Sequence, residues 1–162
     1  MKTIDYDVFN KKQIYEADIK PIIAEIKNTC KNFKIPCFVT CCVASDENGC
    51  EFESTCYSIG KGVTCNLKTV YEDNIAELVQ KLIIECEKNS LPMYISCCVE
   101  NSEYGAEYIR ECRGTGSNGN ILIDDQIATH LCVANGFKVA PVSNIPSLEA
   151  DLLDIIDDLN NS

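Results

Sequence analysis

The chain contains one stretch twice, and this repeat constrains its fold more than any other feature. The segment Cys30–Cys56 aligns without a gap with Cys86–Cys112, at a constant offset of 56 residues. Two copies at this period predict a duplicated supersecondary unit, because a solenoid needs about three or more repeats. The identical pairs are Cys30/Cys86, Pro36/Pro92, Cys41/Cys97, Cys42/Cys98, Val43/Val99, Glu47/Glu103, Gly49/Gly105, Glu51/Glu107 and Cys56/Cys112.

Each copy predicts a helix followed by a β-hairpin. Apolar residues at helical spacing indicate helices over about 18–33 and 73–89, with Asp18 and Asp73 as their N-caps. A hairpin is expected after each helix, over 36–58 and 92–113. The first hairpin contains Asn48-Gly49, a dipeptide typical of a two-residue turn.

We therefore expect an α+β fold: a tandem duplication of an αββ unit that forms an antiparallel sheet of at least four strands, with helices on one face. The two units span about 18–58 and 74–114, within a single domain over 1–162. An extra C-terminal helical segment is expected over about 124–160. Within it, helices are expected over 125–135 and 146–159. Short strands are expected over 63–67, between the two units, and over 121–123 and 137–142.

The twelve cysteines raise the question of metal binding. The expected register places Cys41 opposite Cys56 and Cys97 opposite Cys112, and four converging thiolates would bind zinc tetrahedrally. The chain has no CxxC spacing, which structural zinc sites usually use. We therefore expect no metal or other cofactor. The thiols are interpreted as small apolar groups packed beneath the helices, and the four-cysteine zinc site stays as an alternative.

The net charge of −11 and the isoelectric point near 4.5 argue against direct binding to nucleic acid, which needs a basic surface. An acidic surface suits a protein partner that carries a basic one. The terminal helix predicted over 146–159 has an apolar stripe and an acidic outer face. The residues of that face, which we expect to bind the partner, are Glu149, Asp151, Asp154, Asp157 and Asp158.

Two glycine-containing loops offer an alternative site for a small anion or nucleotide. The string Gly114–Asn120 matches GxGxxG, but a short apolar strand follows it, whereas the dinucleotide fingerprint needs a helix there. Backbone N–H groups and nearby cations can still hold an anion. The residues of this alternative ligand site are Lys61, Arg110, Arg113, Gly114, Gly116 and Asn118.

The sheet face opposite the helices is expected to be polar and uncovered. Phe38, Tyr57 and Tyr94 would lie on it among serines, threonines and acids. Exposed aromatic residues on such a face suggest a contact surface, and so a possible homodimer.

No catalytic motif is present, and nothing marks the lone His130 as a general base. The chain has no apolar run of about 18 residues that could span a membrane, and the N-terminal residues do not resemble a secretory signal.

We expect a cytoplasmic, non-enzymatic binding or inhibitor protein that acts by protein–protein contact, in the manner of small phage antagonists of nucleic-acid enzymes or defence systems. Sequestration of an anionic ligand is the first alternative, and a metal–thiolate protein is the second.

Overall fold

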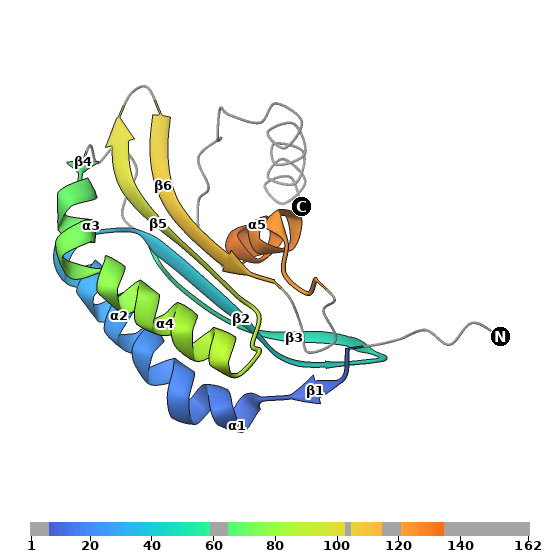
Figure 1. Cartoon of the computed structure of the whole chain (residues 1–162). Coiled ribbons are helices and arrows are strands. Elements are labelled where there is room, and N and C mark those ends of the chain that lie inside the picture. Colours follow the sequence, from blue (N-terminus) through green and yellow to red (C-terminus); the bar gives the residue numbers. More distant parts are fainter. Residues whose placement is uncertain (1–6, 59–64, 103–104, 115–120, 135–162) are drawn as a thin grey trace.

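The computed structural model describes residues 7–58, 65–102, 105–114 and 121–134 of the 162-residue chain. Within these residues the architecture is α+β, and a six-stranded antiparallel sheet carries long helices on one face (Figure 1). The elements are β1 (Phe9–Asn10), α1 (Lys12–Ile14), the π-helical η1 (Tyr15–Ile19), α2 (Lys20–Phe33), β2 (Cys37–Asp46), β3 (Gly49–Tyr57), β4 (Cys65–Asn66), α3 (Lys68–Asn74), α4 (Ala76–Lys88), β5 (Met93–Ser102), β6 (Gly105–Arg113) and α5 (Asp125–Ala134).

The four long strands lie in the order β3, β2, β5, β6. The central strands β2 and β5 pair around Val39 and Ile95, two residues that are themselves 56 positions apart. The short strand β1 pairs with the far end of β2, and β4 pairs in the same way with the far end of β5. Each half of the sheet is therefore built from a short strand, a helical segment and a hairpin.

The same contacts recur in both halves at the offset of 56 residues. The β2–β3 and β5–β6 hairpins have matching registers and matching bulges, and both helix ends have a residue with positive φ, Lys34 (58°) and Ser90 (50°). Equivalent backbone hydrogen bonds are Lys11 N–Val43 O and Leu67 N–Val99 O, Ile35 N–Cys30 O and Leu91 N–Cys86 O, and Cys42 N–Pro92 O and Cys98 N–Pro36 O. The correspondence begins at Phe9 and Cys65, upstream of the expected units.

The predicted register of the hairpins was wrong, because Cys41 pairs with Glu53 instead of Cys56. Asp46 pairs with Gly49, so the first loop consists of Glu47 and Asn48 and lies one residue earlier than expected. The Asp46 carboxylate accepts a hydrogen bond of 2.8 Å from the Asn48 N–H, and Gly49 has φ +130°, a conformation that favours glycine. The earlier loop keeps the faces of the strand, but the bulge between Cys42 and Ala44 shifts the pairing by one further residue and so turns the side chains beyond it to the other face.

Both predicted N-caps were also wrong, because helical structure begins earlier. Asp18 lies inside η1, and Asp73 lies inside α3. Pro21 has no N–H for the ordinary helical hydrogen bond, and the turn before it widens to π-helical geometry instead of ending. In the second half the chain is interrupted at Ile75, between α3 and α4. Pro21 therefore does not mark the first residue of this helical segment.

The main core lies between the sheet and the helices α2 and α4. Fully buried isoleucine and leucine side chains from the helices meet alternate side chains of β2 and β5, and each such burial contributes roughly 1.5–3 kcal/mol. The principal contacts come from Ile19, Ile26, Ile75, Val79 and Leu82 on the helices and from Cys37, Val39, Cys41, Met93, Ile95 and Cys97 on the strands.

The expectation of helices on one face only was wrong. α5 and the segment before it pack on the opposite face, where Ile123 and Ala128 join Phe38, Cys42 and Tyr94 in a second apolar cluster. The Phe38 and Tyr94 side chains are therefore buried, at 0% and 6% exposure. Their ring centroids lie 6.2 Å apart. These aromatic residues form no exposed surface, because an apolar sheet face is covered rather than left in water.

Tyr57, which was expected on the face opposite the helices, instead packs against the main core on the helix side of the sheet. Other expected elements agree with the structure where it describes them. β4 falls within the strand expected over 63–67, and α5 matches the helix expected over 125–135. Ile121 forms a single bridge where a short strand was expected. The strand over 137–142 and the helix over 146–159 lie outside the described residues.

Gly114→Ala should destabilise the fold. A Cβ at this position would clash with the Ile123 carbonyl oxygen, and the Gly114 carbonyl accepts the Leu122 N–H at 2.5 Å, so the two segments are tightly apposed. We expect a loss of about 1–3 kcal/mol in the free energy of unfolding, typical of overpacking. Urea denaturation measures this loss, with Ser58→Ala at an exposed position as the control. Equal stability of the two variants would contradict the close packing.

Candidate functional site

The four cysteines of the predicted zinc site lie on opposite faces of the sheet. Cys41 and Cys97 belong to the core beneath the helices, whereas Cys56 and Cys112 pack against the cluster beneath α5. The register slip separates them, so these four thiols do not converge. Across the described ranges, no three histidine, cysteine, aspartate or glutamate side chains are arranged to hold a metal ion.

The buried thiols instead contact one another across the two halves. Cys30 on α2 hydrogen-bonds with Cys37 and with Cys97 of the other half. Cys86 on α4 hydrogen-bonds with Cys41, which is the equivalent cross-contact at the offset of 56 residues. All five side chains are at most 1% exposed. They act as small packing groups that join helices to strands.

Hydrogen bonding and burial keep the Cys37 and Cys41 thiols neutral. The hydrogen bond to Cys86, together with burial, raises the pKa of Cys41 well above its ordinary value. The hydrogen bond to Cys30, together with burial, raises the pKa of Cys37 in the same way. A neutral, inaccessible thiol is neither a nucleophile nor a metal ligand at ordinary pH.

The cations of the alternative ligand site separate. Arg113 forms ion pairs with Glu87 at 2.6 Å and Glu111 at 3.5 Å, on the helix side of the sheet. Arg110 lies on the other face, half-buried, with its guanidinium carbon 5.6 Å from the centre of the Tyr108 ring. Gly114 packs against the Ile123 backbone, and Lys61, Gly116 and Asn118 lie outside the described residues.

Arg110 occupies a position where the two halves differ. Its equivalent is Ser54, whose hydroxyl lies 2.7 Å from the Thr40 hydroxyl. Arg110 stands opposite Ser96, the equivalent of Thr40. Within the described part of the chain, the Arg110 guanidinium forms no ion pair. The second half therefore presents a cation where the first half has an internal hydroxyl contact.

Several other described cations are engaged within the protein. Lys12 pairs with Glu51 at 2.7 Å, and the equivalent Lys68 pairs with Glu107 at 2.7 Å. Lys11 donates to the Asn89 and Ser90 carbonyls at the end of α4. Surface carboxylates that form no ion pair within the described ranges include Asp18, Glu25, Glu47, Glu72, Asp73, Glu77 and Glu85. The predicted acidic set Glu149, Asp151, Asp154, Asp157 and Asp158 lies outside the described residues.

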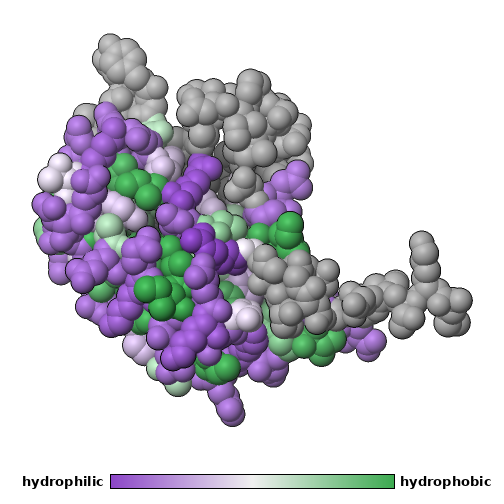
Figure 2. Space-filling model, in the orientation of Figure 1, coloured by the Kyte–Doolittle hydropathy of each residue, from purple (hydrophilic) through white to green (hydrophobic). Residues whose placement is uncertain are grey.

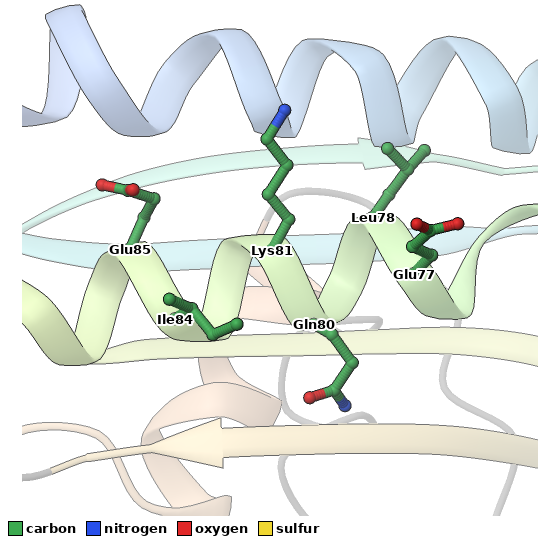
Figure 3. Close-up of a pocket in the computed structure, with 6 residues that line it drawn as sticks. All are labelled: Glu77, Leu78, Gln80, Lys81, Ile84 and Glu85. Carbon is green, nitrogen blue, oxygen red and sulfur yellow. The ribbon is translucent and has the colours of Figure 1, made fainter.

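A shallow groove of about 540 Å³ runs along the outer side of α4 (Figure 3). Its lining combines the apolar Leu78 and Ile84 with the carboxylates of Glu77 and Glu85. Ile84 is 60% exposed. Lys81 extends toward α2, whereas Gln80 extends away from it. Figure 2 shows the surface of the molecule in the orientation of Figure 1. The surface is mainly hydrophilic and is interrupted by small apolar patches.

The sequence reasoning did not identify this groove. The buried face of α4, which includes Val79, Leu82 and Cys86, agrees with the helical spacing of its apolar residues. Ile84 lies off that stripe, and an isoleucine outside the buried face of an amphipathic helix was the available signal. The contact between Cys42 and Cys50 was also missed, because the wrong register placed them apart.

No described helix is long and apolar enough to cross a membrane. Comparison of the chain with protein-family models, with curated proteins and with solved structures finds no match. Function is therefore inferred from the chain's own residues.

Stability should fall as the pH rises above the ordinary thiol pKa. A thiol with a raised pKa in the folded protein stays protonated there while the unfolded chain loses its proton above about pH 8.5. Cys37 and Cys41 are such groups. Each contributes stability that is complete below that pH and declines by about 1.4 kcal/mol per pH unit above it.

Urea denaturation in the presence of a reductant measures this decline. The measurements are made at about pH 7.5, 8.5 and 9.5, which bracket the ordinary thiol pKa of about 8.5. Cys37→Ala should be less stable at every pH but should have a shallower pH slope, because one linked proton is gone. A slope unchanged by this substitution would contradict the assignment.

Proposed function

We propose that this chain is an acidic binding protein, not an enzyme, and that it acts by contact with a protein partner that carries a basic surface. The observation that carries the proposal is the distribution of charge. The net charge is −11, and several of the described cations, among them Lys11, Lys12, Lys68 and Arg113, are engaged in internal ion pairs or carbonyl contacts. The unpaired surface charge is therefore mainly carboxylate, which attracts and orients a basic partner.

The α4 groove is the described surface that suits such a partner best. Glu77 and Glu85 lie at the two ends of the groove, with Leu78, Lys81 and Ile84 between them (Figure 3), and neither carboxylate forms an ion pair within the described part of the chain. Apolar contact at the centre with charge at the rim is the usual anatomy of a protein interface. We propose that the groove receives a segment with lysine or arginine on either side of an apolar side chain. The carboxylates of Glu149, Asp151, Asp154, Asp157 and Asp158 are proposed as a second acidic surface.

Neutralising the groove should weaken binding of a basic amphipathic peptide. The probe is a fluorescently labelled helical peptide of lysine and leucine, followed by anisotropy. Its dissociation constant should rise about tenfold between low and physiological ionic strength. The double variant E77Q/E85Q should weaken binding further, because it removes unpaired charge. E51Q is the matched control, because it removes a carboxylate that is already paired with Lys12.

A second variant separates the two acidic surfaces. Replacing Asp151, Asp154, Asp157 and Asp158 with Asn should abolish binding if the C-terminal surface dominates. It should leave the effect of E77Q/E85Q intact if the groove dominates. Affinity that is insensitive to salt and to both variants would overturn the acidic-surface proposal.

An oxyanion-binding function is the second candidate, and Arg110 favours it. We infer that the chain is a tandem duplication of a strand–helix–hairpin unit, which the matching registers at the offset of 56 residues support. In a duplicated scaffold, positions where the copies differ in chemistry are the natural places for function. Arg110 is such a position, since its equivalent Ser54 has a neighbour in Thr40. The Tyr108 ring holds the guanidinium, whose N–H donors suit phosphate or carboxylate.

Arg110→Gln should abolish a phosphate response on this face. Titration with inorganic phosphate, followed by amide NMR shifts, should perturb Ser96 and Tyr108. The variant should bind at least about tenfold more weakly, because charge-assisted hydrogen bonds are lost. R113Q is the matched control, because Arg113 is already paired with Glu87 on the other face. Equal responses of both variants, or none in the native protein, would dismiss this candidate.

A further inference from the structure

Cys42 and Cys50 form a thiol contact between β2 and β3. The register places Cys50 opposite Ser45 and Cys42 opposite Phe52, with a bulge between Cys42 and Ala44. The bulge brings the two side chains together on the face opposite α2 and α4, where the thiols hydrogen-bond. The Cys50 sulfur also lies 3.6 Å from the Ser45 hydroxyl, and the Cys42 sulfur lies 3.5 Å from the Ala44 carbonyl.

Accessibility distinguishes this pair from the other thiol contacts. The cysteines that contact one another beneath the helices are completely buried. Cys42 is also buried, but Cys50 is exposed at the start of its strand. Among the thiol contacts of the described residues, this pair is therefore the one that a reagent in solution reaches without unfolding the sheet.

The second half supplies an internal contrast. Cys98 is equivalent to Cys42, and its sulfur lies at the same 3.5 Å from the equivalent carbonyl, that of Glu100. The residue equivalent to Cys50 is Ala106. The exposed thiol is thus an addition of the first hairpin and is not needed for the bulge or for strand pairing.

We propose that Cys42 and Cys50 are a redox modification site that forms a disulfide across β2 and β3 when the protein meets a peroxide. The Cys50 thiolate attacks a peroxide oxygen, and the O–O bond breaks. This leaves Cys50 as a sulfenic acid and releases hydroxide, which is protonated to water. The Cys42 sulfur then attacks the Cys50 sulfur, the S–O bond breaks, and a second water leaves with the Cys42 proton. Two thiols lose two electrons in total, and the peroxide is reduced to two waters.

The environments of the two thiols assign their order of reaction. Burial, followed by the neighbouring Cys50, raises the pKa of Cys42 to about 12, so Cys42 is protonated and shielded when peroxide arrives. Cys50 is the thiol that reacts with the peroxide first, because it is exposed. Resolution by Cys42 is the slower step, since it needs the thiolate of a group with a high pKa. The sulfenic acid at Cys50 should therefore exist long enough to be trapped.

The test treats the reduced, folded protein with hydrogen peroxide and follows its intact mass. The expected product has lost two hydrogens, and dimedone added with the peroxide should label Cys50 instead. Proteolysis after Glu47 separates the two cysteines, so a linked pair of peptides identifies the bond. Cys50→Ser should abolish both products. Cys42→Ala should abolish the disulfide and leave the Cys50 sulfenic acid.

Two results would overturn the proposal. One is a Cys50 sulfenic acid that persists in the native protein without forming the bond to Cys42. The other is a disulfide that joins other cysteines. Cys56→Ser, on the same face of the sheet, is the matched control and should give the same yield as the native protein. The variant at exposed Cys50 should fold normally, since Ala106 fills the equivalent place, and circular dichroism checks this.

Discussion

The antiparallel pairing of β2 with β5 is the constraint on which the rest of the structure depends. It is centred on Val39 and Ile95, and it makes a continuous sheet from two hairpins that would otherwise be separate. A lone hairpin is marginal in water, whereas a sheet of several strands with an apolar face can bury a core. The pairing also brings Cys30 against Cys97 and Cys86 against Cys41, so each helix packs on a strand of the other half. Neither half buries its apolar face alone.

Some charged side chains on the surface form ion pairs within the protein, and others do not. The ion pairs Lys12–Glu51 and Lys68–Glu107 recur at equivalent positions and connect each helix start to its hairpin. Exposed pairs of this kind contribute only about 0–1 kcal/mol each, so the fold is held mainly by its apolar contacts. Each pair neutralises one cation and one carboxylate, and because the chain has 25 acidic and 14 basic residues, carboxylates such as Glu77 and Glu85 stay unpaired.

Comparison of the two halves separates what the fold needs from what it carries. The helix thiols Cys30 and Cys86 keep their chemistry and serve packing, and Lys34 and Ser90 keep a positive φ and serve chain direction. Arg110 and Cys50 differ from their equivalents Ser54 and Ala106 without disturbing the shared register. The structure tolerates either residue there, so physical necessity does not explain the choice. At these positions the two halves share a backbone register but differ in side-chain chemistry.

The sequence by itself determined the α+β class, the helices, the hairpins and their equivalence, because apolar periodicity and a gapless repeat are local properties of the chain. The inward positions of Cys41 and Cys97 also followed from alternation along β2 and β5. Only the tertiary structure decided which faces Cys56, Cys112 and Arg110 occupy, because the bulges after Cys42 and Cys98 shift the pairing by one residue and so turn the rest of each outer strand to the other face. The burial of Phe38 and Tyr94 was equally non-local, since it depends on α5 packing on the second face. The same reason separates the four cysteines of the alternative zinc site, because side chains can converge only if the register turns them to one face.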